Sequence, residues 1–255
     1  MRPRTLSLIV LVAACSSGSE PPVTRSQGSG SGSGSVVAVV VDAAPADAST
    51  LKQHMLEHFA NVSELQRAIA RGHLDDAKKH ARWLASHDEQ LLDGWKPYVD
   101  EMRAAARAVA DAADLPTAAA LVSRLGLACS GCHVARSAIV TFAWAPAPDE
   151  DPALQVQMKR HQWAAARLWE GLVGPSDEMW SQGTSALAES KLDTFAAASG
   201  SKRGDVVALA GQVRTLAKRA TKLTVREERG KLYGELLSTC AGCHQLVRPN
   251  PVPGP

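Results

Sequence analysis

The sequence predicts an all-α protein built as two tandem four-helix bundles. Apolar residues make up 45% of the 255 residues, which is enough for a buried core in one or two domains. Aromatic residues are only 4%, and long alternating runs of Val, Ile and Thr are few, which argues against most β architectures. One helical pattern also occurs twice between residues 50 and 248.

Residues 1–14 are typical of a secretory signal peptide. Arg2 and Arg4 precede a short apolar stretch, residues 6–12, that is too short to span a bilayer as a mature helix. The segment Val12-Ala13-Ala14-Cys15 resembles a bacterial lipobox. We therefore expect cleavage before Cys15, lipidation of its sulfur, and a lipid-anchored protein in the periplasm or at the outer membrane. The alternative is an ordinary signal peptide with an incidental cysteine.

Residues 15–49 are predicted to form a flexible tether. They are rich in Ser and Gly, with the run GSGSGSGS at 28–35. Residues 36–41 (VVAVVV) interrupt this composition and could dock on a domain or lie at the membrane. Loss of Arg2 and Arg4 from the 28 basic residues leaves 26, equal to the 26 acidic ones. Zero formal charge and the lack of a basic cluster argue against nucleic-acid binding.

The first expected domain covers residues 50–145. Helical periodicity predicts helices over 50–71, 74–88, 97–113 and 116–137. Gly72 lies 17 residues after Met55 and is placed to end the first helix.

The second expected domain covers residues 151–248, with helices over 152–173, 176–190, 204–221 and 225–247. Asp151-Pro152 predicts a capped start, Ser176-Asp177-Glu178 places acids at a helix N-terminus, and Thr224 with Glu227 fits a capping box. The proline-rich residues 145–152 separate the two domains, and the proline-rich tail 249–255 should be extended.

Each domain contains the motif CxxCH near its end. The motifs are Cys129-Ser130-Gly131-Cys132-His133 and Cys240-Ala241-Gly242-Cys243-His244. CxxCH is the attachment signature of c-type haem: the two thiols bond to the haem vinyl groups, and the histidine binds the iron as proximal ligand. The sequence therefore predicts two covalently attached haem c groups, with His133 and His244 as proximal ligands.

Two other uses of paired cysteines fit less well. A thioredoxin-like CxxC follows a strand in a βαβ unit, and no such pattern surrounds these motifs. A four-cysteine zinc site would need the two pairs to converge, although they lie 111 residues apart in the sequence.

The two copies also agree upstream of the motifs. Leu121 and Leu125 precede Cys129 at the spacing with which Leu232 and Leu236 precede Cys240. Steps of four residues place these side chains on one helical face, so each CxxCH is expected late in an amphipathic helix.

This arrangement resembles the class II c-type cytochromes, the cytochrome c prime family. The resemblance rests on the late CxxCH, on the segment AIARG at 68–72, and on Arg248 four residues after His244; in the first copy Arg136 follows His133 by three. It implies four-helix bundles with the haem near the end of the last helix and a sixth iron position facing the first helix. No methionine follows Cys243, unlike in the common small cytochromes c.

The sixth iron ligand has candidates at matching positions of the two copies. His58 and His161 are candidate distal ligands, Met55 and Met158 are the alternatives, and an open site is the third possibility. His54 is expected to be exposed. His73, His80 and His87 recur every seven residues, about 10.5 Å apart along a helix, and are expected at the boundary of the core. Trp163, Trp169 and Trp180 are expected in the core or at the haem wall, with an electron conduit as the alternative.

The function expected from these features is one-electron transfer by a dihaem cytochrome, with unidentified redox partner proteins and a membrane contact through the lipid anchor. One alternative is NO or CO binding at an open sixth site, and another is a haem peroxidase. The sequence shows no nucleophile–base constellation, phosphate-binding glycine loop or metalloprotease helix, so a carrier is favoured over an enzyme.

Overall fold

The part of the chain that the structure describes is mainly helical. The computed structural model describes residues 48–88, 94–192 and 200–247. These ranges contain eight α-helices, one short 3-10 helix and no strand, which confirms the all-α prediction. The predicted signal peptide, Cys15, nearly all of the tether, Arg248 and the tail lie outside the described residues.

The helices follow the predicted ranges to within a few residues. The first half contains α1 (Ala48–Ala70), α2 (Leu74–Ser86), α3 (Lys96–Ala110) and α4 (Leu115–Ala135). The second half contains α5 (Leu154–Val173), α6 (Asp177–Ala188), the 3-10 helix η2 (Gly200–Lys202), α7 (Arg203–Ala220) and α8 (Arg226–Val247). Helix α1 thus takes in the last two residues of the expected tether.

The predicted helix ends were right at two places and wrong at two. Gly72 ends α1 with a positive φ of 76°, and the N–H of His73 donates to Ala68 O at 2.8 Å, which closes a Schellman turn. Ser176 caps α6 by accepting from Met179 N at 3.3 Å. Asp151 does not cap α5, because its carboxylate instead accepts from Ala153 N at 2.6 Å and the helix starts at Leu154. Thr224 lies two residues before the start of α8.

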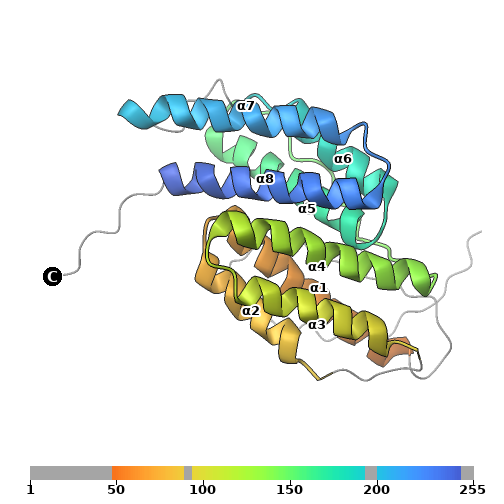
Figure 1. Cartoon of the computed structure of the whole chain (residues 1–255). Coiled ribbons are helices and arrows are strands. Elements are labelled where there is room, and N and C mark those ends of the chain that lie inside the picture. The colour runs from red at the N-terminus through yellow and green to blue at the C-terminus, as the bar shows by residue number, and fades with distance from the viewer. Residues whose placement is uncertain (1–47, 89–93, 193–199, 248–255) are drawn as a thin grey trace, which may run out of the picture. The chain divides into compact units, whose positions relative to one another are not determined.

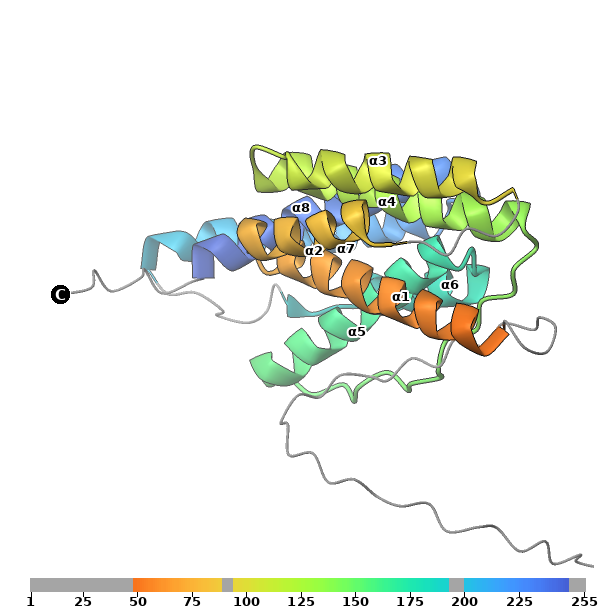
Figure 2. The same cartoon turned by 90° about the horizontal axis from the view of Figure 1, so that it is seen from below.

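Each helix packs against the next one within its half, and α4 and α8 join the halves (Figures 1 and 2). Two further contacts between the halves correspond to each other: α1 touches α8, and α5 touches α4. Within the halves, α1 touches α4 and α5 touches α8. Exchanging the halves therefore reproduces the set of contacts.

Helices α4 and α8 run antiparallel. Gly230 packs against Leu127, where a Cβ would lie 2.7 Å from Leu127 Cδ1. One turn further along α8, Gly234 lies against Ala120 and Ser123. Extending the Gly230–Leu127 register places Gly242, the centre of the second motif, opposite Leu115, which is about 24 Å from Gly131 along the helix axes at a rise of 1.5 Å per residue. The motifs consequently lie at opposite ends of the α4–α8 pair.

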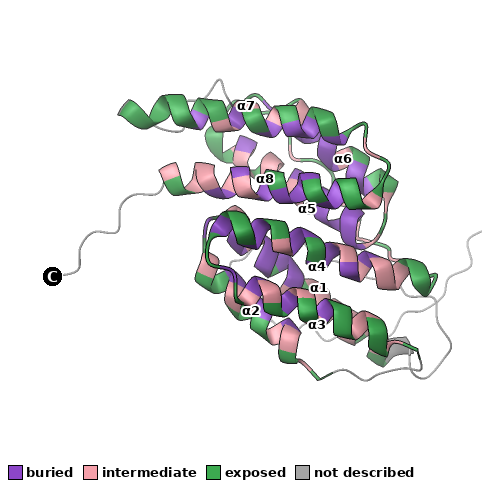
Figure 3. Ribbon diagram, viewed as in Figure 1, coloured by how far each residue is buried: buried purple, intermediate pink, exposed green. Residues whose placement is uncertain are grey.

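One continuous core crosses both halves (Figure 3). Leu65, Leu84, Leu125, Leu168 and Leu232 are all buried in it. Within the described ranges, α4 is the one helix whose length and composition would also suit a membrane span, a test that core helices of globular proteins pass as well. All described helices belong to one compact unit, Ser35–Pro255.

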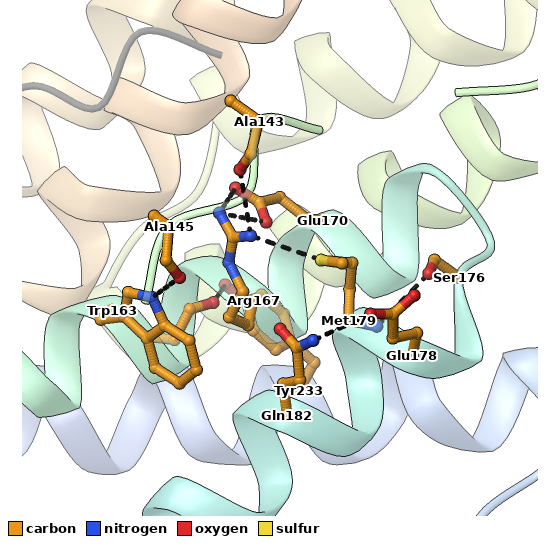
Figure 4. Close-up of polar contacts among 11 residues, drawn as sticks. Ala143, Ala145, Trp163, Arg167, Glu170, Ser176, Glu178, Met179, Gln182 and Tyr233 are labelled. Carbon is orange, nitrogen blue, oxygen red and sulfur yellow. Dashed lines mark hydrogen bonds and ion pairs between the residues drawn. The ribbon is translucent and has the colours of Figure 1, made fainter. Parts of the chain in front are cut away.

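The segment 138–150 between the halves is bonded along α5 (Figure 4). Trp163 Nε1 donates to Ala145 O at 2.9 Å, and Arg160 Nη1 donates to Pro148 O at 2.9 Å. Phe142 also packs on Phe59 of α1, with ring centroids 5.3 Å apart. The connection is therefore a fixed strap, at least between residues 142 and 148.

A buried ion pair lies beside the strap, in the last two turns of α5 (Figure 4). Arg167 Nη2 is 2.7 Å from Glu170, and both side chains are only 3% exposed. Arg167 also reaches Met179 Sδ at 3.4 Å and Ala143 O at 3.4 Å. Burial raises the pKa of Glu170 to about 7, although Arg167 acts in the opposite direction.

Candidate functional site

The first CxxCH occupies the end of α4. Cys129, Cys132 and His133 are all partly buried there. Cys129 and Cys132 lie three residues apart in a helix, so both thiols lie on one side of it. The helix thereby presents two sulfur atoms and an imidazole within its last two turns.

His133 is oriented by a contact with the other half of the chain. Its Nδ1 lies 2.7 Å from the carbonyl oxygen of Val173, at the end of α5. A carbonyl oxygen only accepts, so Nδ1 carries the proton, and Nε2 keeps the lone pair that a metal requires. Burial lowers the pKa of His133, which keeps the imidazole neutral at pH 7. This is the usual way in which a protein fixes the tautomer of a metal-binding histidine.

The second CxxCH occupies the end of α8 in corresponding surroundings. Cys240, Cys243 and His244 are partly buried, and burial lowers the pKa of His244 as well, helped by the charge of Arg71 at the end of α1. The next residue, Gln245, packs on Gly72 in the turn after α1. Each motif therefore approaches the C-terminal end of the first helix of the opposite half.

The environment of the cysteines suppresses their ionisation. Burial raises the pKa of Cys129 and of Cys240 to about 12, and the neighbouring thiols of Cys132 and Cys243 add to this effect. Burial also raises the pKa values of Cys132 and Cys243. In the folded chain these four residues are thus neutral thiols in largely apolar surroundings.

The structure places His161 near the second motif. The pKa of His161 is lowered to about 4, first by burial and then by the charge of His244, which lies close enough to act on it. Its Nε2 lies 2.5 Å from Ser190 Oγ, at the end of α6. Binding of a metal through this nitrogen would exchange the serine hydroxyl for the metal. Met158 is partly buried on the same helix.

The surroundings of His58 in the first half are different. Its ring lies beside two other imidazoles, with ring centroids 4.4 Å from His54 and 5.7 Å from His87. The expectation that His54 is exposed was wrong, because its side chain is partly buried against these rings. Met55 is partly buried as well. The matching sequence positions of the two copies therefore have unlike neighbours.

Of the three histidines expected at the boundary of the core, His80 and His87 are partly buried and agree with that expectation, whereas His73 does not. His73 is exposed beside Asp76, and the partly buried His80 contacts Asn61 Oδ1 at 3.0 Å. His87 follows α2 as its C-cap and joins the cluster of His54 and His58. The available sequence signal for that cluster was the spacing of four between His54 and His58, which places both on one face of α1.

The tryptophans are structural in this arrangement. Trp169 is 1% exposed and stacks on Tyr233 of α8 at 5.6 Å between ring centroids. Trp180 is 2% exposed, and its indole donates to Ala220 O at 3.0 Å. Trp163 is partly buried under the strap. Core packing accounts for all three side chains.

Two open pockets lie at equivalent places in the halves. The larger, of about 780 Å³, lies between the α1–α2 turn, the start of α4 and Gln245. The smaller, of about 380 Å³, lies between the α5–α6 turn, the start of α8 and Val134. Both are formed where a CxxCH helix meets the opposite half, and neither is lined by a motif cysteine or histidine.

Comparison of the chain with protein-family models, with curated proteins and with solved structures gave no match. Two thiols and an imidazole, present at two places and with Nε2 available on His133, are the donor set that a covalently attached haem needs.

Proposed function

We propose that the chain is a dihaem c-type cytochrome that carries single electrons on the periplasmic side of a bacterial envelope. The observation that carries this proposal is the contact of His133 Nδ1 with Val173 O, because it leaves Nε2 for iron in a histidine that directly follows a CxxC pair. In this proposal each half is a four-helix bundle of the class II cytochrome type with one haem.

The motif residues would hold the two haems. Cys129 and Cys132 would bind the first haem, and Cys240 and Cys243 the second, through thioether bonds. His133 and His244 would supply the proximal nitrogen. When bound, the haem supplies the one-electron chemistry of its iron, and the protein tunes that chemistry through ligands and burial.

The protein also sets the electronic character of the proximal imidazole. A hydrogen bond from Nδ1 to a carbonyl makes the imidazole a stronger donor than it would be in water. Val173 provides that carbonyl from the opposite half, at 2.7 Å. The first site would therefore depend on correct packing of α4 against α5.

The distal ligand completes the proposal for the second half. His161 is the candidate there, since it is neutral, partly buried and near His244; Met158 on the same helix is the alternative. In the first half, Met55 and His58 occupy the corresponding positions. Imidazole in the sixth position favours a lower reduction potential, and a thioether favours a higher one.

A gas-binding protein for NO or CO is the second candidate. It is supported by the contacts of the two candidate distal histidines. Ser190 already contacts Nε2 of His161, and His58 lies among imidazoles, so each side chain has a partner other than a haem iron. A haem whose sixth position is left open by these side chains would bind CO. A haem peroxidase would need such an open site as well.

The test is the haem content of variants made in a bacterium that attaches c-type haem. The wild-type chain should carry two haems per chain, measured as the pyridine haemochrome, whereas Cys132→Ala and Cys243→Ala should each carry one. The matched control is Cys15→Ser, which should keep both haems and release the protein from the membrane fraction. Two haems in either motif variant, or none in the wild type, would overturn the proposal.

The absorption spectrum of the reduced protein with and without CO separates the carrier from the gas-binding protein. An unchanged low-spin spectrum means that both irons have strong ligands on both sides. A CO-dependent shift means that at least one sixth position is open.

A further inference from the structure

We propose that His54, His58 and His87 form a binding site for a divalent transition-metal ion, distinct from both CxxCH motifs. The side chains come from α1 and from the C-cap of α2. One imidazole nitrogen from each lies within 4.8 Å of the corresponding nitrogens of the other two. All three are partly buried, so the site is shielded and still reachable from solvent.

The backbone places these nitrogens for chelation. His54 and His58 lie four residues apart on α1, the spacing that puts two side chains on one helical face. His87 closes the set from the neighbouring helix, its ring stacked on that of His54 at 5.4 Å between centroids. Around a tetrahedral ion with metal–nitrogen bonds of about 2.0 Å, ligand nitrogens lie about 3.3 Å apart. The nitrogens lie within 4.8 Å of one another, so metal binding would require the imidazoles to rotate toward the ion.

Neighbouring groups hold His87 in place. Trp83 stacks on its ring, with centroids 3.9 Å apart and planes 23° from parallel. Arg103 Nη2 donates to the backbone carbonyl of His87, so this guanidinium is engaged by the main chain. Trp83 also contacts the edge of His58 at 5.8 Å between centroids. An aromatic wall thus backs two of the three imidazoles.

The second half provides an internal comparison. Gln157 stands one residue before Met158, as His54 stands before Met55, and Ser190 takes the place of His87 beside His161. The second half therefore pairs one imidazole with a serine hydroxyl, whereas the first half groups three imidazoles.

The donor set selects the metal. Three imidazole nitrogens suit Zn²⁺ and Cu²⁺, whereas Mg²⁺ and Ca²⁺ prefer oxygen ligands. A fourth position would be left for water or another small ligand, as in three-histidine zinc sites. An ion bound here uses His58, which would leave Met55 as the distal candidate for the first haem.

The experiment uses the full-length protein with its haems attached. Zn²⁺ is titrated calorimetrically at pH 7.5, and Cu²⁺ binding is followed by electron paramagnetic resonance, which detects coordinated nitrogen. The wild type should bind one ion per chain with nitrogen ligands. His54→Gln and His87→Ser, which install the residues of the second half, should each weaken binding by more than about tenfold.

The control is His73→Gln, which changes an exposed histidine of the α1–α2 turn and should leave the affinity unchanged. Circular dichroism verifies that each variant keeps its helices. Binding that is absent in the wild type, or that persists unchanged in His54→Gln and His87→Ser, overturns the proposal. Haem content is measured separately on the same samples, so failure of the metal site is distinguishable from failure of haem attachment.

Discussion

Glu170 is a carboxyl group that the fold buries beside Arg167. Both side chains are 3% exposed, and the pair is 2.7 Å apart. Burial nevertheless outweighs the guanidinium, since the pKa of Glu170 rises from its ordinary 4.5 to about 7. The folded chain consequently binds this proton more tightly than the unfolded chain does.

This shift predicts how stability depends on pH. Because the folded-state pKa is the higher one, the contribution of Glu170 to the free energy of unfolding is fully present below pH 4.5 and is lost as the pH rises through about 7. Urea unfolding at a series of pH values, compared between the wild type and Glu170→Gln, isolates this contribution. The wild-type curve should fall relative to the variant over that window, and parallel curves would contradict the pKa shift.

Glycines set how closely the helices approach one another. In α6, a Cβ on Gly183 would lie 2.6 Å from Ala164 O and 2.8 Å from Leu168 N, both backbone atoms of α5. In α7, a Cβ on Gly211 would meet no atom within 4 Å. Gly183 therefore allows two helices to pack closely, whereas Gly211 makes no close contact and only adds backbone freedom to α7.

Alanine at these two positions should change stability in opposite directions. Gly183→Ala forces α6 away from α5 and should destabilise the fold by about 1–3 kcal/mol. Gly211→Ala only removes backbone freedom from the unfolded chain, so it should stabilise the folded protein by about 0.5–1 kcal/mol. Chemical unfolding of both variants provides the comparison, and equal shifts would show that the α5–α6 contact is looser than described.

At the scale of the whole molecule, the two halves share one core. The buried cluster runs from Val62 in α1 to Leu237 in α8 without a break between the halves. Trp169 of α5 contributes directly to this continuity, because it contacts Gly126 of α4.

A shared core predicts unfolding in one step. Differential scanning calorimetry of the full protein should show a single transition whose calorimetric and van't Hoff enthalpies agree. Gly126→Val, which places an isopropyl group against the Trp169 ring, should move that whole transition to lower temperature. Two separated transitions, with only one of them shifted, would mean that the halves unfold independently.

Local signals explain why the helices were predictable. The end of α1 at Gly72 and the start of α6 at Ser176 depend on neighbouring residues, and the CxxCH motifs are contiguous. The antiparallel pairing of α4 with α8 was not predictable, since Gly230 and Leu127 meet across more than a hundred residues. His87 joined His54 and His58 for the same reason: the contact depends on how α2 packs on α1, which the spacing within α2 does not encode.

The exchange of halves that reproduces the helix contacts has a consequence for what one half can do alone. The two halves use equivalent helices to contact each other. Helix α4 faces α8, α1 faces α8, and α5 correspondingly faces α4. The helices are thus arranged like the subunits of a two-fold homodimer, although the residues that meet are not the same on both sides, since Gly230 of α8 faces Leu127 of α4. A chain holding only one half would leave its face of α4 or α8 uncovered, and the covalent connection keeps the matching face of the other half beside it.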